Sequence, residues 1–286
     1  MTNNAAVLRS VEKRYKDFTL GPIDLTIPTG TIVGLVGENG AGKTTTLKLL
    51  CGVNPADAGE ITLLGSHPTD PAIRARLGVV FEDAYFYSGL NAEQIGKSMA
   101  GIFGDRWNAG QFADYLQRFG LDAKKKVSEY SRGMRMKLSL ATALAHNPDL
   151  LVLDEATAGL DPVVRSEMLD LFLEFIQDED HSILMSSHIT SDLEQVADSI
   201  AYLHHGKLLF HEEKDALLQE YGLLRCSRSQ LEKLPIGTVV HTREGTFGCE
   251  SLVKGRAEVQ RLLPEAVCDP ATIDDIMRFY SGRDAQ

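Results

Sequence analysis

Residues 32–44 read Ile-Val-Gly-Leu-Val-Gly-Glu-Asn-Gly-Ala-Gly-Lys-Thr, and this stretch decides the fold. Its first five residues form an unbroken apolar run, which is typical of a strand buried on both faces of a parallel sheet. Residues 37–44 then match the pattern G-x-x-x-x-G-K-[ST], and a helical pattern follows over residues 45–50. A strand, a glycine-rich loop and a helix in this order predict a phosphate-binding loop.

The residue types in this loop suit phosphate chemistry. Glycines let backbone N–H groups turn toward phosphates without a clashing side chain, and the N-terminus of the next helix adds its dipole. We expect Lys43 to contact the β and γ phosphates of a nucleotide and the Thr44 hydroxyl to bind Mg²⁺. The predicted nucleotide-binding residues of this stretch are Gly37, Glu38, Asn39, Gly40, Ala41, Gly42, Lys43, Thr44 and Thr45.

The flanking pattern predicts an α/β fold. Further apolar runs at 150–153 and 183–185 alternate with helical patterns at 134–146 and 163–177, as in a parallel sheet. The N-terminal runs 6–8, 18–20 and 23–27 favour an antiparallel sheet, with a turn at Gly21-Pro22. We therefore expect a P-loop NTPase core with a mainly parallel sheet and an N-terminal antiparallel β subdomain.

Two further regions complete the predicted organisation. Residues from about 84 to 145 show helical periodicity and are interpreted as a helical insert within a domain spanning 1–212. Residues 213–286 are interpreted as a small C-terminal α+β appendage, with a helix at 212–221, a strand at 237–242 and a helix at 272–280. Thr272 followed by Asp275 predicts a cap for that last helix.

Two acids follow the apolar run Leu150–Leu153. In parallel sheets ligands bind at the carboxyl ends of strands, so Asp154 and Glu155 are expected where the phosphate loop also points. Asp154 would hold Mg²⁺ through water, and Glu155 would orient or deprotonate the attacking water. Alone, such a pair is as often a polar strand exit, but beside the phosphate loop it indicates catalysis.

Further motifs resemble those of ATP-binding cassette (ABC) ATPases. Residues 130–134, Tyr-Ser-Arg-Gly-Met, resemble the family's L-S-G-G-Q signature and precede the Asp-Glu strand by one helix. Ala158-Gly159-Leu160-Asp161 resembles the D-loop, His188 the H-loop histidine, and Tyr15 the aromatic that stacks on adenine. The resemblance covers roughly residues 5–212. Taken singly, His188 reads as a satisfied polar residue, Tyr15 as a packed aromatic and Ser131 as a helix cap.

The resemblance implies an ATPase that works as a head-to-tail dimer. Two copies of the chain would sandwich two Mg-ATP, with the phosphate loop, Asp154, Glu155 and His188 of one copy facing the other copy's signature. Ser131 and Gly133 would then reach the γ-phosphate across the interface, because a hydroxyl and an unobstructed N–H at a helix start bind anions. Glu155 and His188 are the implied catalytic residues, and Asp161 is also expected to contact the nucleotide.

The sequence departs from the family pattern at three places. Glu82 follows the run 79–81 where the family has the Q-loop glutamine, and it is expected to bind Mg²⁺ or its water. Arg132 and Met134 replace the signature's Gly and Gln, and Arg132 is expected to pair with phosphate or with an acid of a partner. Ala156 replaces a usual Pro. The first two departures put the timing and the rate of hydrolysis in question.

The composition of the chain limits the classes of partner that we expect. The chain has 40 acids and 29 bases, for a net charge of −11, so nucleic acid is not an expected partner. The 4 cysteines show no metal or disulfide spacing and predict reduced thiols in the cytosol. No signal pattern and no apolar run of about 18 residues is present, so a separate membrane permease is expected to supply the membrane part.

The resemblance is greatest to ATPases of bacterial ABC-2-type exporters. It implies a cytoplasmic protein, peripheral on the inner face of the cell membrane, whose helical insert grips the permease. The aromatics Tyr85, Phe86 and Tyr87 are expected to anchor that contact. The alternatives are a soluble ABC ATPase acting on a non-membrane assembly, an ATP sensor that does not hydrolyse, and an importer ATPase.

Overall fold

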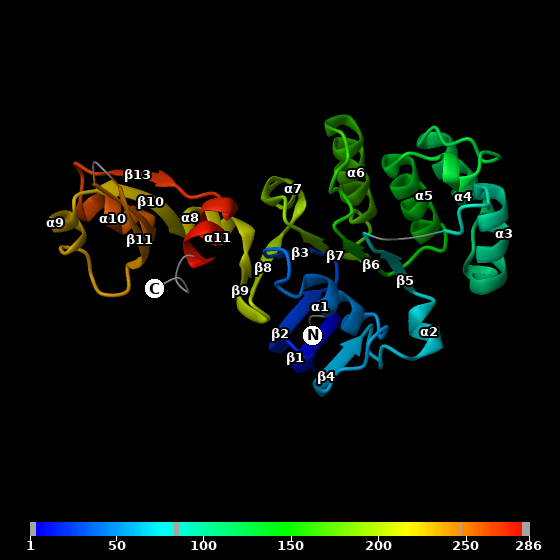
Figure 1. Cartoon of the computed structure of the whole chain (residues 1–286), viewed down its shortest axis with the longest axis horizontal. Coiled ribbons are helices and arrows are strands. Elements are labelled where there is room, and N and C mark those ends of the chain that lie inside the picture. Colours follow the sequence, from blue (N-terminus) through cyan, green and yellow to red (C-terminus); the bar gives the residue numbers. More distant parts are fainter. Residues whose placement is uncertain (1–3, 83–85, 246–247, 282–286) are drawn as a thin grey trace.

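The computed structural model describes residues 4–82, 86–245 and 248–281. They form three sheets with flanking helices, arranged along one long axis (Figure 1). The six-stranded central sheet has the order β5-β6-β7-β3-β8-β9. Its pairs are parallel except the antiparallel edge pair β8–β9. The strands are β3 (Ile32–Val36), β5 (Leu77–Val80), β6 (Leu150–Asp154), β7 (Ser182–Ser187), β8 (Ser199–His204) and β9 (Lys207–Glu213).

The centre of this sheet is buried on both faces. Every residue of β3, β6 and β7 is buried. Along β3, Ile32 and Val36 pack in one apolar cluster, whereas Val33 and Leu35 pack in the other. Because successive side chains of a strand point to opposite faces, a strand covered on both sides needs apolar residues at every position. The unbroken apolar runs in the sequence follow from this arrangement, and the expected mainly parallel core is confirmed.

The N-terminal antiparallel sheet covers one face of the central sheet. Its order is β2-β1-β4, formed by β1 (Asn4–Arg14), β2 (Thr19–Pro28) and β4 (Ala58–Leu63). The expected turn at Gly21-Pro22 is wrong, since β2 runs through both residues and pairs Ile23 with Val11. The apolar alternation of β1 and β2 faces the same cluster as Val33 and Leu35, so this sheet and the central sheet share one core.

Helices fill the remaining layers. Those at the central sheet are α1 (Lys43–Leu50), α2 (Pro71–Arg74), α6 (Pro162–Phe175) and α7 (Thr190–Val196). Those of the insert are α3 (Ala92–Phe103), α4 (Ala109–Arg118) and α5 (Arg132–Leu144), with the 3-10 turns η1 (Gly104–Arg106) and η2 (Val127–Glu129). A capping box between Asn91 and Gln94 begins α3, which satisfies N–H groups that a helix start leaves unpaired.

The C-terminal part is an α+β unit at one end of the molecule (Figure 1). Its antiparallel sheet has the order β11-β12-β10-β13, formed by β10 (Tyr221–Cys226), β11 (Val239–Gly245), β12 (Gly248–Lys254) and β13 (Val267–Pro270). Its helices are α8 (Lys214–Glu220), α9 (Arg228–Leu231), α10 (Arg256–Leu262) and α11 (Ile273–Ser281). The helix expected at 212–221 is shorter, because β9 ends at Glu213 and β10 begins at Tyr221.

Helix α11 joins this unit to the central domain. The Thr272 Oγ1 accepts from the Asp275 N–H at 3.1 Å and donates to the Asp275 carboxylate at 2.8 Å, as the sequence predicts for the start of this helix. The Ile273 N–H donates to Glu194 of α7 at 2.8 Å. Among the residues described, no helix is both long enough and apolar enough to span a membrane.

Candidate active site at the carboxyl edge of the central sheet

The loop between β3 and α1 is shaped by its glycines. Gly42 has φ +109°, which L side chains rarely adopt, and a Cβ there would lie 2.7 Å from Leu20 Cδ1. A Cβ on Gly37 would lie 2.3 Å from the Leu203 carbonyl oxygen. The loop therefore packs tightly on its inner side without side chains. On its outer side Glu38, Asn39, Gly40 and Thr44 are exposed, while Ala41 is buried and Thr45 is half-buried.

Lys43 carries a buried positive charge into this loop. Its Nζ donates to the carbonyl oxygen of Gly37 at 2.7 Å and to that of Glu38 at 3.3 Å. It also lies 3.3 Å from Glu155 Oε1, an ion pair that lacks hydrogen-bond geometry. A buried ammonium group normally requires a full set of acceptors. The carboxylate and two carbonyls near Lys43 match the three N–H groups of its ammonium, so an incoming anion would take the place of one of these partners.

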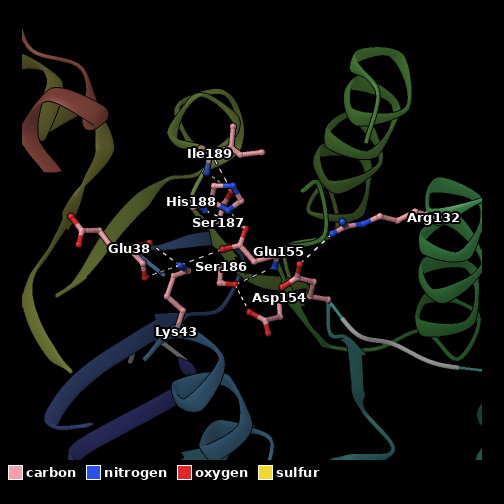
Figure 2. Close-up of polar contacts among 11 residues, drawn as sticks. Glu38, Lys43, Arg132, Asp154, Glu155, Ser186, Ser187, His188 and Ile189 are labelled. Carbon is pink, nitrogen blue, oxygen red and sulfur yellow. Dashed lines mark hydrogen bonds and ion pairs between the residues drawn. The ribbon is translucent and has the colours of Figure 1, made fainter. Parts of the chain in front are cut away.

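The two acids at the end of β6 are held by the neighbouring strand β7 (Figure 2). Ser186 donates its hydroxyl to Asp154 Oδ1 at 2.6 Å, and the Glu155 N–H donates to Ser186 Oγ at 3.2 Å. Glu155 has φ +52°, an uncommon backbone conformation for a residue with a side chain. Ser186 is not among the residues predicted from the sequence, where its only signal is the polar end of an otherwise apolar strand.

His188 meets Glu155 from the end of β7. Its Nδ1 lies 2.7 Å from Glu155 Oε2, and its backbone N–H donates to the same oxygen at 3.3 Å. A carboxylate can only accept, so Nδ1 is the protonated nitrogen and Nε2 is left for another group. The His188 side chain is about half exposed. Glu155 therefore lies between the ammonium of Lys43 and the imidazole of His188, as Figure 2 shows.

Glu82 is placed differently from the rest of the set. It follows β5, at the same edge of the sheet as Asp154, and its Oε1 accepts from Arg132 Nη2 at 3.2 Å. We expected this carboxylate to bind Mg²⁺ or its water. In the structure its partner is the arginine of the signature segment.

The signature and D-loop residues lie apart from Lys43. Ser131 caps α5, where its hydroxyl accepts from the Met134 N–H at 3.2 Å, and Gly133 lies in the first turn of that helix. Asp161 caps α6 and accepts from the Val164 N–H at 3.1 Å. At both helix starts a side-chain oxygen accepts from an N–H that the helix itself leaves unpaired.

Tyr15 lies beside the phosphate loop with an exposed ring. It stacks on Phe18 with 6.4 Å between ring centroids, and Phe18 Cζ would lie 3.0 Å from a Cβ on Gly42. This places an aromatic face next to the loop. Tyr15 as a whole is 44% exposed, so an aromatic side chain is accessible beside the loop.

The residues at this edge could hold a magnesium ion only together with the phosphates of a bound ligand. Among the described residues no group of three or more His, Cys, Asp or Glu side chains is arranged to hold a metal. The Thr44 hydroxyl is exposed at the loop, and Asp154 is buried nearby with its hydrogen bond to Ser186. Mg²⁺ usually keeps several waters and uses one or two protein oxygens plus phosphates, which this donor set matches.

A separate groove lies between the central domain and the helical insert. It has a volume of about 610 Å³ and is lined mostly by apolar side chains, including Val53, Phe81, Phe86 and Phe103. His146 lines it as well and stacks on Phe103 at 4.0 Å between ring centroids. Burial lowers the pKa of His146, which favours the neutral imidazole in this groove. Tyr85, named above as an interface residue, lies outside the described residues.

Comparisons with known proteins identify related chains. The family model described as ABC transporter matches residues 20–158. The bacitracin transport ATP-binding protein BcrA of Bacillus licheniformis is 38% identical over 194 residues, which are 65% of this chain and 62% of that protein. The lantibiotic transport ATP-binding protein SrtF of Streptococcus pyogenes is 32% identical over 211 residues, which are 73% of this chain and 90% of that protein.

Solved structures have the same fold. The ATP-binding subunit of an ABC transporter superposes with a TM-score of 0.69 at 25% identity, covering 75% of this chain and 92% of that one. A dimeric ATP-binding cassette in a post-hydrolysis state, bound to ADP and Pi, superposes with a TM-score of 0.66 at 22% identity, covering 73% and 98%. Both matches span roughly three quarters of the chain, so the remaining quarter lies outside the shared fold.

Proposed function

The chain belongs to the family of ABC transporter ATP-binding proteins, and from this premise we propose that it binds and hydrolyses Mg-ATP in a head-to-tail dimer. In that dimer it would drive a separate membrane permease. The observation that carries the proposal is the position of Glu155, buried between Lys43 and His188 at the end of β6. A carboxylate held by two positively polarised groups beside a phosphate loop is positioned to accept a proton, which an ordinary polar residue at the end of a strand would not be.

ATP binding would redistribute the charges around Glu155. The phosphates would compete for the Lys43 ammonium, which now rests on carbonyl oxygens and near Glu155 Oε1. Once Lys43 turns to the phosphates, Glu155 Oε1 becomes free to accept a proton from the attacking water. His188 keeps Oε2 oriented, and Mg²⁺, when bound through Thr44 and Asp154, supplies charge neutralisation at the phosphates.

The proposed dimer would explain why position 133 is a glycine. A Cβ on Gly133 would make only ordinary contacts, the shortest being 3.7 Å to Leu160 Cδ2. Packing within the chain therefore does not require glycine at this position. An approaching phosphate of a second subunit's nucleotide would require it, because a side chain would cover the N–H groups at the start of α5.

The groove beside the helical insert is the proposed contact for the permease. Its apolar lining suits an amphipathic helix, and Val53 and Tyr87 add exposed apolar surface. The relatives BcrA and SrtF are named for bacitracin and lantibiotic transport. By analogy with these relatives, we propose that the protein drives the export of a small peptide-like cargo from the cytoplasmic face of the membrane. The chain spans 62% of the length of BcrA.

The test is the ATPase rate of the purified protein as a function of its concentration, for the wild type and for Glu155→Gln. A sandwich dimer predicts a rate that rises faster than linearly, a loss of about 100-fold or more in Glu155→Gln, and an ATP-dependent dimer of the variant by light scattering. Glu220→Gln, an exposed acid in α8, is the matched control and should behave as the wild type. A rate that is linear in concentration and indifferent to Glu155 would refute both the dimer and the site.

A further inference from the structure

The two main departures from the family pattern contact each other. Glu82 and Arg132 are 50 residues apart in sequence, yet Arg132 Nη2 lies 3.2 Å from Glu82 Oε1. Figure 2 shows the arginine reaching from the start of α5 across to the edge of the central sheet. An uncharged glutamine and a glycine are the family's usual residues here. A carboxylate and a guanidinium replace them as a pair, so the charge that one adds is cancelled by the other.

A third segment makes room for the arginine. Gly159 of the D-loop has φ +68°, and a Cβ there would lie 2.9 Å from Arg132 Nη1 and 3.1 Å from Arg132 Cζ. The guanidinium therefore lies directly against the backbone of the D-loop, and a Cβ at position 159 would push this flexible end of Arg132 aside. Arg132 thus contacts both the segment that follows β5 and the segment that follows β6.

The position of Glu82 makes its charge important. Strand β5 pairs with β6 in parallel, with Val80 opposite Leu153, so Glu82 and Asp154 leave the sheet at the same edge. Neighbouring strands lie about 5 Å apart. This edge already holds Asp154 and Glu155 beside the ammonium of Lys43. A third uncompensated carboxylate would repel the phosphates that the loop is built to bind.

We propose that Arg132 is a positioning residue that neutralises Glu82 within its own subunit and keeps this carboxylate turned away from the bound nucleotide. The proposal rests on the nucleotide site described above, and it gives the signature arginine a role in its own subunit's site. The other role open to Arg132, a contact with the phosphates held by a second subunit, is the competing outcome of the test.

The expected effect is modest because the pair is half exposed. Both side chains keep about 50% of their surface in contact with solvent, so water and salt screen the interaction. A unit charge on the order of 10 Å from a phosphate would change the affinity for that phosphate by about a few-fold. We therefore expect Arg132→Ala to weaken nucleotide binding by about threefold to tenfold at low salt, with the effect shrinking as salt screens the charge.

The experiment measures the affinity of the monomer for a fluorescent ATP analogue without Mg²⁺, at protein concentrations too low for dimers. Its variants are Arg132→Ala, Arg132→Lys, Glu82→Gln and the double variant Glu82→Gln/Arg132→Ala. Arg132→Ala should weaken binding, while the double variant should bind as tightly as Glu82→Gln alone. Arg132→Lys keeps the positive charge and should restore most of the affinity.

Gly159→Ala is a second route to the same state, because its Cβ would displace the guanidinium while leaving both charges in the chain. It should also weaken binding, and circular dichroism would verify that each variant is folded. The proposal would be overturned if Arg132→Ala weakened nucleotide binding equally in the presence and in the absence of the Glu82 carboxylate. It would also be overturned if Arg132→Ala left the affinity of the monomer unchanged and weakened binding only in the dimer. Failure of the wild type to bind the analogue would instead refute the proposed function.

Discussion

The buried ion pair between α6 and α7 gives the sharpest stability prediction. Arg165 Nε donates to Asp192 Oδ1 at 2.5 Å, and Arg165 Nη2 donates to Ser191 Oγ at 2.9 Å. Asp192 is 1% exposed, and its Oδ2 has no hydrogen-bond partner among the described residues. Arg165→Met would leave a buried carboxylate without its counter-charge, which is one of the costliest single changes in a protein interior.

The magnitude follows from burial. Removing one partner of a buried pair costs about 3–5 kcal/mol, and we expect the lower end, about 3 kcal/mol, because the arginine side is partly exposed. For a domain of this size that corresponds to a fall in Tm of roughly 6–12 °C. Adding Asp192→Asn to Arg165→Met removes the orphan charge, so the double variant should recover much of the loss.

Thermal unfolding followed by circular dichroism, with urea unfolding as a second measure, would test this prediction. The matched control is Arg118→Met. Arg118 forms a bidentate pair with Glu174, at 2.5 and 2.8 Å, but both side chains are about half exposed. Its loss should cost below about 1 kcal/mol. If Arg165→Met and Arg118→Met destabilise the protein equally, the argument from burial is wrong.

Two further predictions concern the phosphate loop and the groove. Gly42→Ala places a Cβ 2.7 Å from Leu20 Cδ1 on a backbone with φ +109°, so the nucleotide affinity measured by titration should fall by at least about tenfold. An unchanged affinity would show that the loop does not hold the phosphates. Val53→Asp puts a charge at the exposed rim of the groove and should reduce co-purification with a co-expressed permease without changing nucleotide binding. Val267 on β13 is about as exposed, and Val267→Asp should leave co-purification unchanged. Equal yields of complex for both variants would place the permease contact elsewhere.

Most of the central domain could be predicted from sequence because its signals are local. A strand buried on both faces is apolar at every position, and a loop that cradles phosphates needs glycine where φ is positive, as at Gly40 and Gly42. The C-terminal unit lacked such signals. In β10 the buried run Tyr221 to Leu224 is interrupted by Gly222 and is followed by Arg225, and β13 has only four residues, so neither showed a readable pattern.

The sequence by itself determined the parallel core, the phosphate loop and the order of the motifs along the chain, because each depends on residues within one turn or one strand. Only the tertiary structure decided which side chains meet. Ser186 with Asp154, His188 with Glu155 and Arg132 with Glu82 join residues 32, 33 and 50 positions apart. Their contacts arise from the order of strands in the sheet and from the packing of α5 against its edge, and a linear pattern does not encode either of these. The chemistry of the site therefore depends on pairings that appear only once the strands lie side by side.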